Sequence, residues 1–384
     1  MVFKLENTLS IFNQFKIKKI AKLGSFLFGT AAVLSNQAPA HAGPTGMCDN
    51  IWSVNSDGNT GSLRYCNNYS LDATNSDLER AVIVIHGTNR NADVYYENML
   101  NAAINAEAED NTMIIAPQFL TDDDLVKLGL PEDEYLSWSS GGWKSGSSNS
   151  DPFRYSTYSI VDDMIATLTN SDLFPNLKEI VVAGHSAGGQ FVNRYAASTQ
   201  VEPEGVRVKY VVANPSSYLY LDGKRVVKGT LDKFEIPDAE TIEACSRYNE
   251  WRYGLDDLFD YPARVGADGI RDQYKDRDVV YLLGNEDNDP NYSSLAKGCR
   301  AMLQGSQRLE RGTIYFNYLE DFYGARTHRK VIVEGVEHSN GDMFNSPEGR
   351  EELFGSKNTT KVPESSTTAG LLTVSFGTTQ TFSS

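Results

Sequence analysis

Short apolar runs alternate along this chain with segments in which apolar residues recur at helical spacing. The run at residues 179–183 is rich in β-branched side chains, which is typical of a strand buried on both faces. In the segment that follows, 190–199, Phe191 and Tyr195 share one helical face. Further strands are predicted at residues 80–87, 112–118, 206–214, 278–284 and 330–333, and further helices at 91–109 and 158–168. Strands that alternate with helices predict an α/β fold with a mostly parallel sheet, covered by helices on both faces.

A G-x-S-x-G motif, residues 184–188, joins the strand at 179–183 to the helix that follows it. A strand, a sharp turn with a central serine and a helix are the context of a nucleophile elbow. We expect glycine at both ends of the motif, because a side chain there would collide with neighbouring backbone. The backbone N–H of Ala187, at the helix start, is then free to stabilise a developing oxyanion. The motif therefore predicts Ser186 as a nucleophile.

A nucleophilic serine needs a general base, and the base needs an acid that orients it. His338 lies just past the C-terminal end of the last predicted strand, and such strand ends line the ligand crevice of a parallel sheet. The other histidines lie in the leader, at the end of the 80–87 strand, inside the elbow or at the opposite end of the sheet: His41, His86, His185 and His328. His338 is therefore the predicted base.

Two further segments do not follow this alternating pattern: an insertion within it and a predicted hairpin before it. The alternation is interrupted between residues 217 and 277 by an insertion rich in aromatic and charged residues. Before the first strand of the alternating series, residues 51–54 and 62–65 flank Asp57-Gly58 and predict a β-hairpin.

The order of these motifs resembles the α/β-hydrolase superfamily over roughly residues 80–354. The resemblance implies the α/β-hydrolase fold, with the insertion at 218–276 forming a cap above the active site. In this family a glycine closes the penultimate strand and the catalytic aspartate follows three residues later, which matches Asp287 after Gly284. Glu286 and Asp289 remain alternatives for the acid.

The resemblance also implies the second oxyanion donor. The His86-Gly87 pair is similar to the family's His-Gly segment, in which the next residue donates its N–H. Thr88 and Ala187 would then form the oxyanion hole, with His86 as a structural hydrogen-bonding group. This chemistry involves no cofactor and no metal ion.

The first 42 residues predict a signal peptide. A lysine-rich segment at 16–22 precedes a short apolar segment at 23–34, and Ala40-His41-Ala42 supplies a small-x-small cleavage site. About a dozen apolar residues are too few to span a bilayer, so we expect an exported chain without a stable membrane span. The expected hydrolase domain covers residues 43–358.

Charge and cysteine content agree with export. The formal net charge is −16, so a nucleic acid is not an expected partner. All four cysteines follow the signal peptide, and an even count in an oxidising compartment predicts two disulfides. Three pairings are possible. Cys48 and Cys66 flank the predicted hairpin and could meet across it, and Cys245 and Cys299 are then left to pair. A zinc site is disfavoured, because neither C-x-x-C nor a histidine cluster accompanies them.

Residues 359–384 are rich in serine and threonine and lack helical or strand periodicity, which predicts a disordered tail. Val362-Pro363-Glu364-Ser365-Ser366-Thr367 resembles the opening of bacterial PEP-CTERM sorting signals. That family has proline where Ser365 stands, followed by an apolar span and a basic cluster that this tail lacks. The signal is therefore degenerate or truncated.

The sequence predicts an exported serine hydrolase that cleaves a carboxylic ester through an acyl-enzyme. A serine peptidase or polymer depolymerase of the same fold is an alternative, and so is a binding protein that kept the fold without catalysis. Aromatic faces suited to stacking on sugars or aromatic acyl groups give the candidate substrate-binding residues Trp138, Trp143 and Trp251.

Overall fold

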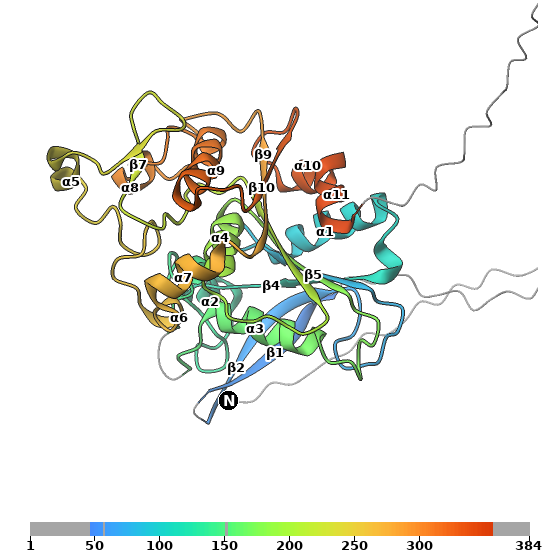
Figure 1. The fold of residues 1–384 in the computed structure, drawn as a ribbon. Helices are drawn as coiled ribbons and strands as arrows, with labels where there is room; N and C mark the ends of the chain where they lie inside the picture. Colours follow the sequence, from blue (N-terminus) through green and yellow to red (C-terminus); the bar gives the residue numbers. More distant parts are fainter. Residues whose placement is uncertain (1–46, 57, 150–152, 356–384) are drawn as a thin grey trace, which may run out of the picture. The chain divides into compact units, whose positions relative to one another are not determined.

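The computed structural model describes residues 47–56, 58–149 and 153–355 (Figure 1). The predicted signal peptide and the predicted C-terminal tail lie outside these residues. None of the helices in the described ranges combines the length and the apolar character that a bilayer-spanning helix needs.

The centre of the fold is a sheet in which eight strands of the described residues pair in the order β1-β2-β4-β3-β5-β6-β9-β10. The strands are β1 (Met47–Ser56), β2 (Asn59–Asn67), β3 (Arg80–Ile85), β4 (Thr112–Pro117), β5 (Glu179–His185), β6 (Arg207–Ala213), β9 (Asp278–Gly284) and β10 (Arg329–Val333). β1 pairs antiparallel with β2, and β2 with β4, while all the other neighbours are parallel. The mostly parallel sheet predicted from the sequence is therefore confirmed.

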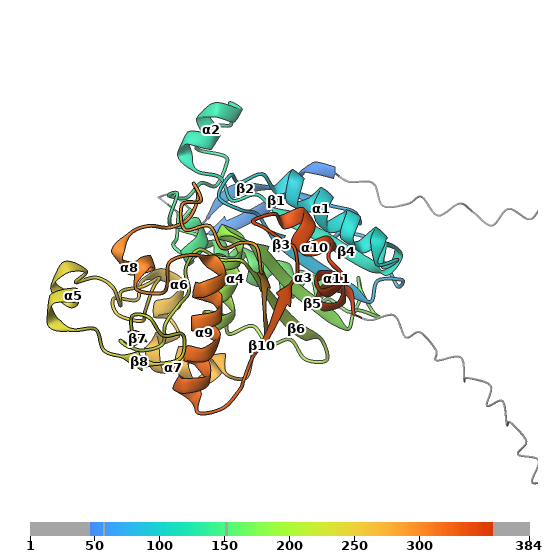
Figure 2. The same ribbon diagram turned by 90° about the horizontal axis from the view of Figure 1, so that it is seen from above.

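Alternate residues of each central strand enter two separate cores. In β3, Ile83 and Ile85 join the core formed with α3 (Thr157–Leu168), α4 (Ala187–Ser198), α7 (Gly266–Tyr274) and α9 (Arg308–Tyr323). Val82 and Val84 face the other core, formed with α1 (Ala92–Asn105), α10 (Asn340–Asn345) and α11 (Pro347–Phe354). Because successive side chains of a strand point to opposite faces, an unbroken apolar run is what a sheet covered on both sides requires. Figure 2 shows the helices on either side of the strands.

The predicted hairpin is present as β1 and β2, in which Trp52 lies opposite Leu63. Cys66 in β2 is disulfide-bonded. Its predicted partner, Cys48, has a side chain outside the described part of the chain. The hairpin continues the sheet through three residue pairs between β2 and β4.

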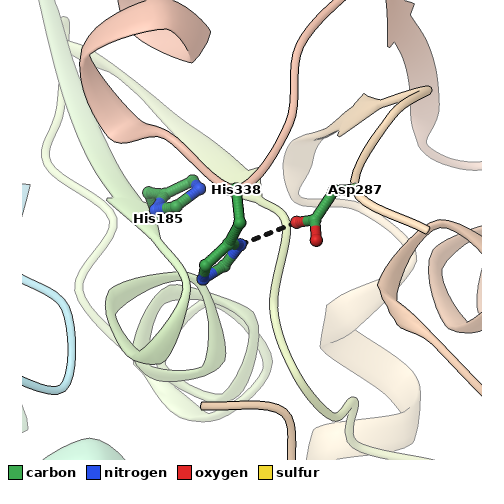
Figure 3. A group of neighbouring side chains, drawn as sticks. All are labelled: His185, Asp287 and His338. Atoms are coloured by element: carbon green, nitrogen blue, oxygen red, sulfur yellow. Dashed lines mark hydrogen bonds and ion pairs between the residues drawn. The ribbon is translucent and has the colours of Figure 1, made fainter. Parts of the chain in front are cut away.

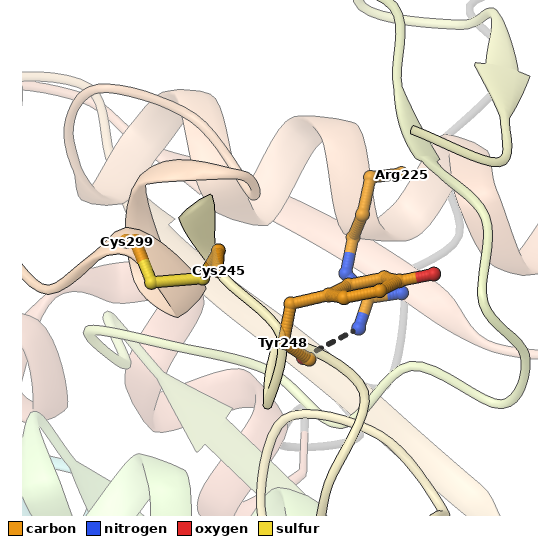
Figure 4. The surroundings of a disulfide bond; sticks show 4 residues. All are labelled: Arg225, Cys245, Tyr248 and Cys299. Atoms are coloured by element: carbon orange, nitrogen blue, oxygen red, sulfur yellow. Dashed lines mark hydrogen bonds between the residues drawn. A yellow bond between two sulfur atoms is a disulfide. The ribbon is translucent and has the colours of Figure 1, made fainter. Parts of the chain in front are cut away.

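The insertion between β6 and β9 contains β7 (Arg225–Val226), β8 (Phe234–Glu235), α5 (Ala239–Ala244), α6 (Asp260–Ala263) and α7. Its last helix packs against α4, where the Asn193 amide donates to the Tyr274 hydroxyl over 2.9 Å, so this part of the insertion covers the sheet. The earlier part is fastened by a disulfide between Cys245 and Cys299, the latter in α8 (Cys299–Met302). Beside that bond, the buried Arg225 donates to the carbonyl of Tyr248 over 3.0 Å (Figure 4).

Candidate active site

Ser186 stands between the end of β5 and the start of α4, with φ 60° and ψ −117°. A positive φ is uncommon for a residue with a side chain. A Cβ on Gly184 would strike the carbonyl of Gly188, and a Cβ on Gly188 would strike that of Ile85. Strand, turn and helix therefore pack too closely for any residue but glycine at these two positions, as the sequence motif predicts.

Two loops that leave the C-terminal strand ends bring the predicted base and acid to the serine. His338 follows β10, and its Nε2 lies 2.9 Å from Ser186 Oγ. Asp287 follows β9, and its Oδ2 lies 2.7 Å from His338 Nδ1 (Figure 3). Asp287 is buried, whereas the alternatives Glu286 and Asp289 are exposed. The structure thus brings together the three residues named from the sequence, in the order Ser, His, Asp.

A buried arginine completes this arrangement. Arg308, the first residue of α9, donates from Nη1 to the other carboxylate oxygen of Asp287 over 3.3 Å. Its Nη2 donates to Ser294 Oγ over 3.0 Å, and its guanidinium lies 4.9 Å from the ring centre of Tyr292. Burial lowers the pKa of His338, the hydrogen bond to Asp287 raises it, and the charge of Arg308 lowers it. The net effect lowers the pKa of His338, which favours the neutral imidazole whose Nε2 can accept a proton from the serine hydroxyl.

His185 lies beside this group, and its ring centre is 4.5 Å from that of His338 (Figure 3). Burial lowers the pKa of His185 well below its usual value, and the nearby His338 adds to the effect. His185, Asp287 and His338 offer ligand atoms within 4.8 Å of one another. However, the carboxylate already accepts from His338 and from the cationic Arg308, which would repel a metal cation. The arrangement fits proton transfer better than metal binding.

Thr88 and Ala187, the predicted oxyanion donors, both line the pocket at Ser186. Ala187 is the first residue of α4, so its N–H has no acceptor one turn earlier in the helix. The loop that carries Thr88 is fixed by the fully buried His86, whose Nδ1 contacts Gly87 O at 2.9 Å and whose Nε2 accepts from Phe119 N over 3.0 Å. Burial lowers the pKa of His86 to about 4, which fits the structural role predicted for it.

The pocket has a volume of about 230 Å³ and a lining that is more polar than apolar. Its lining comprises Thr88, Lys144, Ser186, Ala187, Gln190, Ser216, Arg252, Tyr253, Ser294 and Ala296. Arg252 and Tyr253 belong to the insertion predicted as a cap. The insertion therefore contributes directly to the wall of the pocket.

The three tryptophans predicted to bind substrate do not line this pocket, so the prediction was wrong for this pocket. Trp138, Trp143 and Trp251 are 2%, 0% and 4% exposed. The indole of Trp138 donates to Tyr155 O over 2.9 Å, and that of Trp251 donates to Ser145 O over 2.9 Å. Trp143 packs against the ring of His86. The large apolar surfaces of all three pack in the hydrophobic core.

Four cationic residues in or next to the Ser186 site were not predicted from the sequence: Lys144, Arg194, Arg252 and Arg308. Lys144 follows Trp143 in a glycine- and serine-rich loop, where a single lysine carries no recognisable pattern. Arg194 lies on the helix after the elbow, one turn beyond Gln190. Arg194 shares a helical face with the apolar Phe191. A cation on an apolar face was a sign in the sequence that this helix has polar contacts inside the protein.

No protein-family model matches the chain, and no curated protein matches it. Among solved structures, it is similar to poly(aspartic acid) hydrolase-1 from Sphingomonas sp. KT-1, with 21% identity, 80% of this chain and 99% of that chain covered, and a TM-score of 0.54. It is also similar to LpqC, a poly(3-hydroxybutyrate) depolymerase from Bordetella parapertussis, with 19% identity, 79% and 87% coverage, and a TM-score of 0.53. With the sheet order and the elbow described above, these similarities show that the chain has the α/β-hydrolase fold.

Proposed function

We propose that this protein is a serine hydrolase that cleaves a carboxylic ester through an acyl-enzyme. The observation that carries the proposal is the continuous chain of contacts from Ser186 Oγ through His338 to Asp287, at 2.9 Å and 2.7 Å. These are the distances that nucleophile, general base and orienting acid need.

In the first step Ser186 Oγ attacks the ester carbonyl carbon while its proton passes to His338 Nε2. The carbonyl π electrons move onto oxygen, and the N–H groups of Thr88 and Ala187 bind that oxyanion. The tetrahedral intermediate collapses, the bond to the alcohol oxygen breaks, and the alcohol leaves with the proton from His338. Water then repeats the sequence on the acyl-enzyme, which releases the acid and restores Ser186. Asp287 stabilises the imidazolium in both halves.

Labelling with a fluorophosphonate tests the nucleophile directly, since this probe reacts with an activated serine. We expect one labelled site, at Ser186, together with hydrolysis of 4-nitrophenyl acetate. Loss of both in Ser186→Ala supports the proposal. An unlabelled wild-type protein that hydrolyses no ester would instead support the non-catalytic binding protein.

A polymer depolymerase is the second candidate. By their names, the two similar structures described above act on poly(aspartic acid) and poly(3-hydroxybutyrate). A serine peptidase remains the alternative if amides are cleaved in preference to esters. Release of soluble acid from each polymer, compared with that from a short ester and a short amide, separates the candidates.

We also propose that the protein acts outside the cytoplasm. A disulfide between Cys245 and Cys299 forms and persists in oxidising compartments, which supports export by the predicted leader. Fractionation of cells that express the full chain, with cleavage after residue 42 checked by N-terminal sequencing, tests this location.

A further inference from the structure

Two cations reach the pocket at Ser186 from different parts of the chain. Lys144 lies in the short helix η2 (Trp143–Ser145), and Arg252 lies in the insertion. Arg252 donates from Nη1 to Gly141 O over 2.9 Å, which joins the insertion to the loop of Lys144. Both residues are partly buried and line the same pocket as Ser186 and Ala187.

Neither cation has a carboxylate partner among the residues that the structure describes. The protein as a whole has 51 acidic and 35 basic side chains, so two unpaired cations at one pocket are unexpected. Burial, together with the charges of Arg194, Arg252 and Arg90, lowers the pKa of Lys144 to about 8. A partly buried charge without an anionic partner is unfavourable, and an anion bound by the two cations would reduce that penalty.

The backbone at both cationic residues is also held in place by the fold. Arg194 is fully buried in α4 and donates from Nη1 to Lys144 O over 3.1 Å and from Nε to Arg252 O over 3.0 Å. Its Nη2 donates to Ser217 Oγ over 2.9 Å. One guanidinium therefore fixes the backbone at both cationic residues. This degree of support is typical of a prepared binding site rather than of two solvated surface charges.

The remaining lining excludes a long apolar group. Apart from Ala187 and Ala296, the side chains that line the pocket are polar or charged. The volume of about 230 Å³ is below the roughly 300–1,000 Å³ of sites that enclose drug-sized ligands. A short acyl segment that ends in an anionic group fits both the size and the chemistry.

We propose that Lys144 and Arg252 bind a carboxylate of the substrate, so that the preferred substrate is an ester whose acyl part carries a second, ionised carboxyl group a few bonds from the scissile carbonyl. This inference rests on the proposed function of Ser186 and names the substrate class of the same site. The carboxylate accepts charge-assisted hydrogen bonds from both cations, which orients the scissile carbonyl toward Thr88 and Ala187.

The experiment compares mono-(4-nitrophenyl) esters of succinic, glutaric and adipic acid with the same esters capped as neutral methyl esters. Ser186→Ala supplies the rate of spontaneous hydrolysis. For at least one chain length, we expect the free carboxylate to raise kcat/KM about 10- to 100-fold over its capped counterpart, the range of a charge-assisted contact. In Lys144→Met and in Arg252→Met this ratio falls by about tenfold or more.

Lys127→Met is the matched control, because it removes the same charge from an exposed position at the end of α2 (Asp122–Leu128). We expect it to keep the wild-type ratio. If the wild-type protein cleaves capped and uncapped esters equally well, or prefers the capped ones, the anion inference is wrong while the proposed function stands. If it cleaves neither kind and no fluorophosphonate reacts, the proposed function is wrong.

A second measurement covers a protein that reacts with the fluorophosphonate but turns over none of these esters. Glutarate should slow labelling of Ser186 in the wild-type protein, and dimethyl glutarate should not. This protection should be weaker in Lys144→Met and unchanged in Lys127→Met. Equal protection by the charged and the neutral compound, or none by either, would overturn the inference.

Discussion

Arg308 contacts the same carboxylate that holds the imidazole of His338: its Nη1 lies 3.3 Å from Oδ1 of Asp287, and His338 Nδ1 lies 2.7 Å from Oδ2. Both side chains are buried, at 0% and 2% exposure. The pair therefore sets the electrostatic environment in which His338 accepts a proton.

We expect Arg308→Met to shift the pH dependence of activity upward. The charge of Arg308 lowers the pKa of His338, so its removal raises that pKa, and the neutral base is then populated only at higher pH. The rising limb of kcat/KM against pH should move to higher pH. Arg308→Lys keeps the charge and should restore most of the wild-type profile. An unchanged profile in Arg308→Met would contradict the electrostatic role.

Asp287→Asn should reduce turnover by about 10⁴, because an amide cannot stabilise the imidazolium or select its productive tautomer. Asp289→Asn is the matched control, since Asp289 is exposed and its side chain accepts from the backbone N–H of Asn291. The control should keep nearly full activity. Steady-state kinetics on one ester decides the assignment, and a severe loss in Asp289→Asn instead would transfer the acid role to that residue.

Ser186→Ala should reduce turnover by on the order of 10⁶ with little loss of stability. The hydroxyl contacts His338, and the side chain contributes little to either core. Thermal unfolding followed by circular dichroism, in parallel with the ester assay, separates the two effects. Wild-type hydrolysis by the alanine variant would exclude Ser186 as the nucleophile.

Loss of the Cys245–Cys299 bond should destabilise the protein by up to about 4 kcal/mol, the loop-closure estimate for a separation of 54 residues. The double variant Cys245→Ser with Cys299→Ser should have a lower urea midpoint than the wild type. Reduction of the wild-type protein should lower the midpoint in the same direction. Equal midpoints for the variant and the oxidised wild type would show that the bond contributes no stability.

Acidification should destabilise the fold between pH 6.5 and about 4. Burial lowers the pKa of His86 and of His328 from 6.5 to about 4, so the unfolded chain binds more protons in this range and stability falls as pH falls. Each shift corresponds to about 3 kcal/mol. His328→Gln should show a smaller loss between pH 7 and pH 4 in urea unfolding. An equal loss in the variant would show that His328 does not contribute.

The strands and the elbow could be predicted because local sequence determines them, whereas Asp287 was indicated only by the family resemblance, with Glu286 and Asp289 left as alternatives. The apolar run at 80–87 matches β3 (Arg80–Ile85), and the glycines of the elbow are required by contacts with adjacent backbone. The cationic side chains were not predictable in the same way. Arg308 and Asp287 are 21 residues apart, and Arg252 meets Gly141 across 111 residues, so only the folded chain brings them together.

The three tryptophans were predicted to bind substrate, whereas the structure places them in the core. An aromatic side chain in a loop suits either a ligand or a core, and residue type alone does not distinguish the two. Trp251 lies in the insertion that lines the pocket, but its neighbour Arg252 is the residue that reaches the pocket. Which of two adjacent side chains points inward depends on the path of the insertion, which has no regular period.

The position of Arg194 bears on how strongly the proposed anion site would select substrates by length. The helix that begins after Ser186 also carries Arg194, whose guanidinium donates to the backbone carbonyls of Lys144 and Arg252. The backbone positions of the nucleophile and of the two cationic residues are therefore linked through one side chain, so the proposed anion site lies at a defined distance from Ser186. Diacid half-esters that differ by a single methylene should fall on either side of a sharp optimum in length, rather than along a gradual slope.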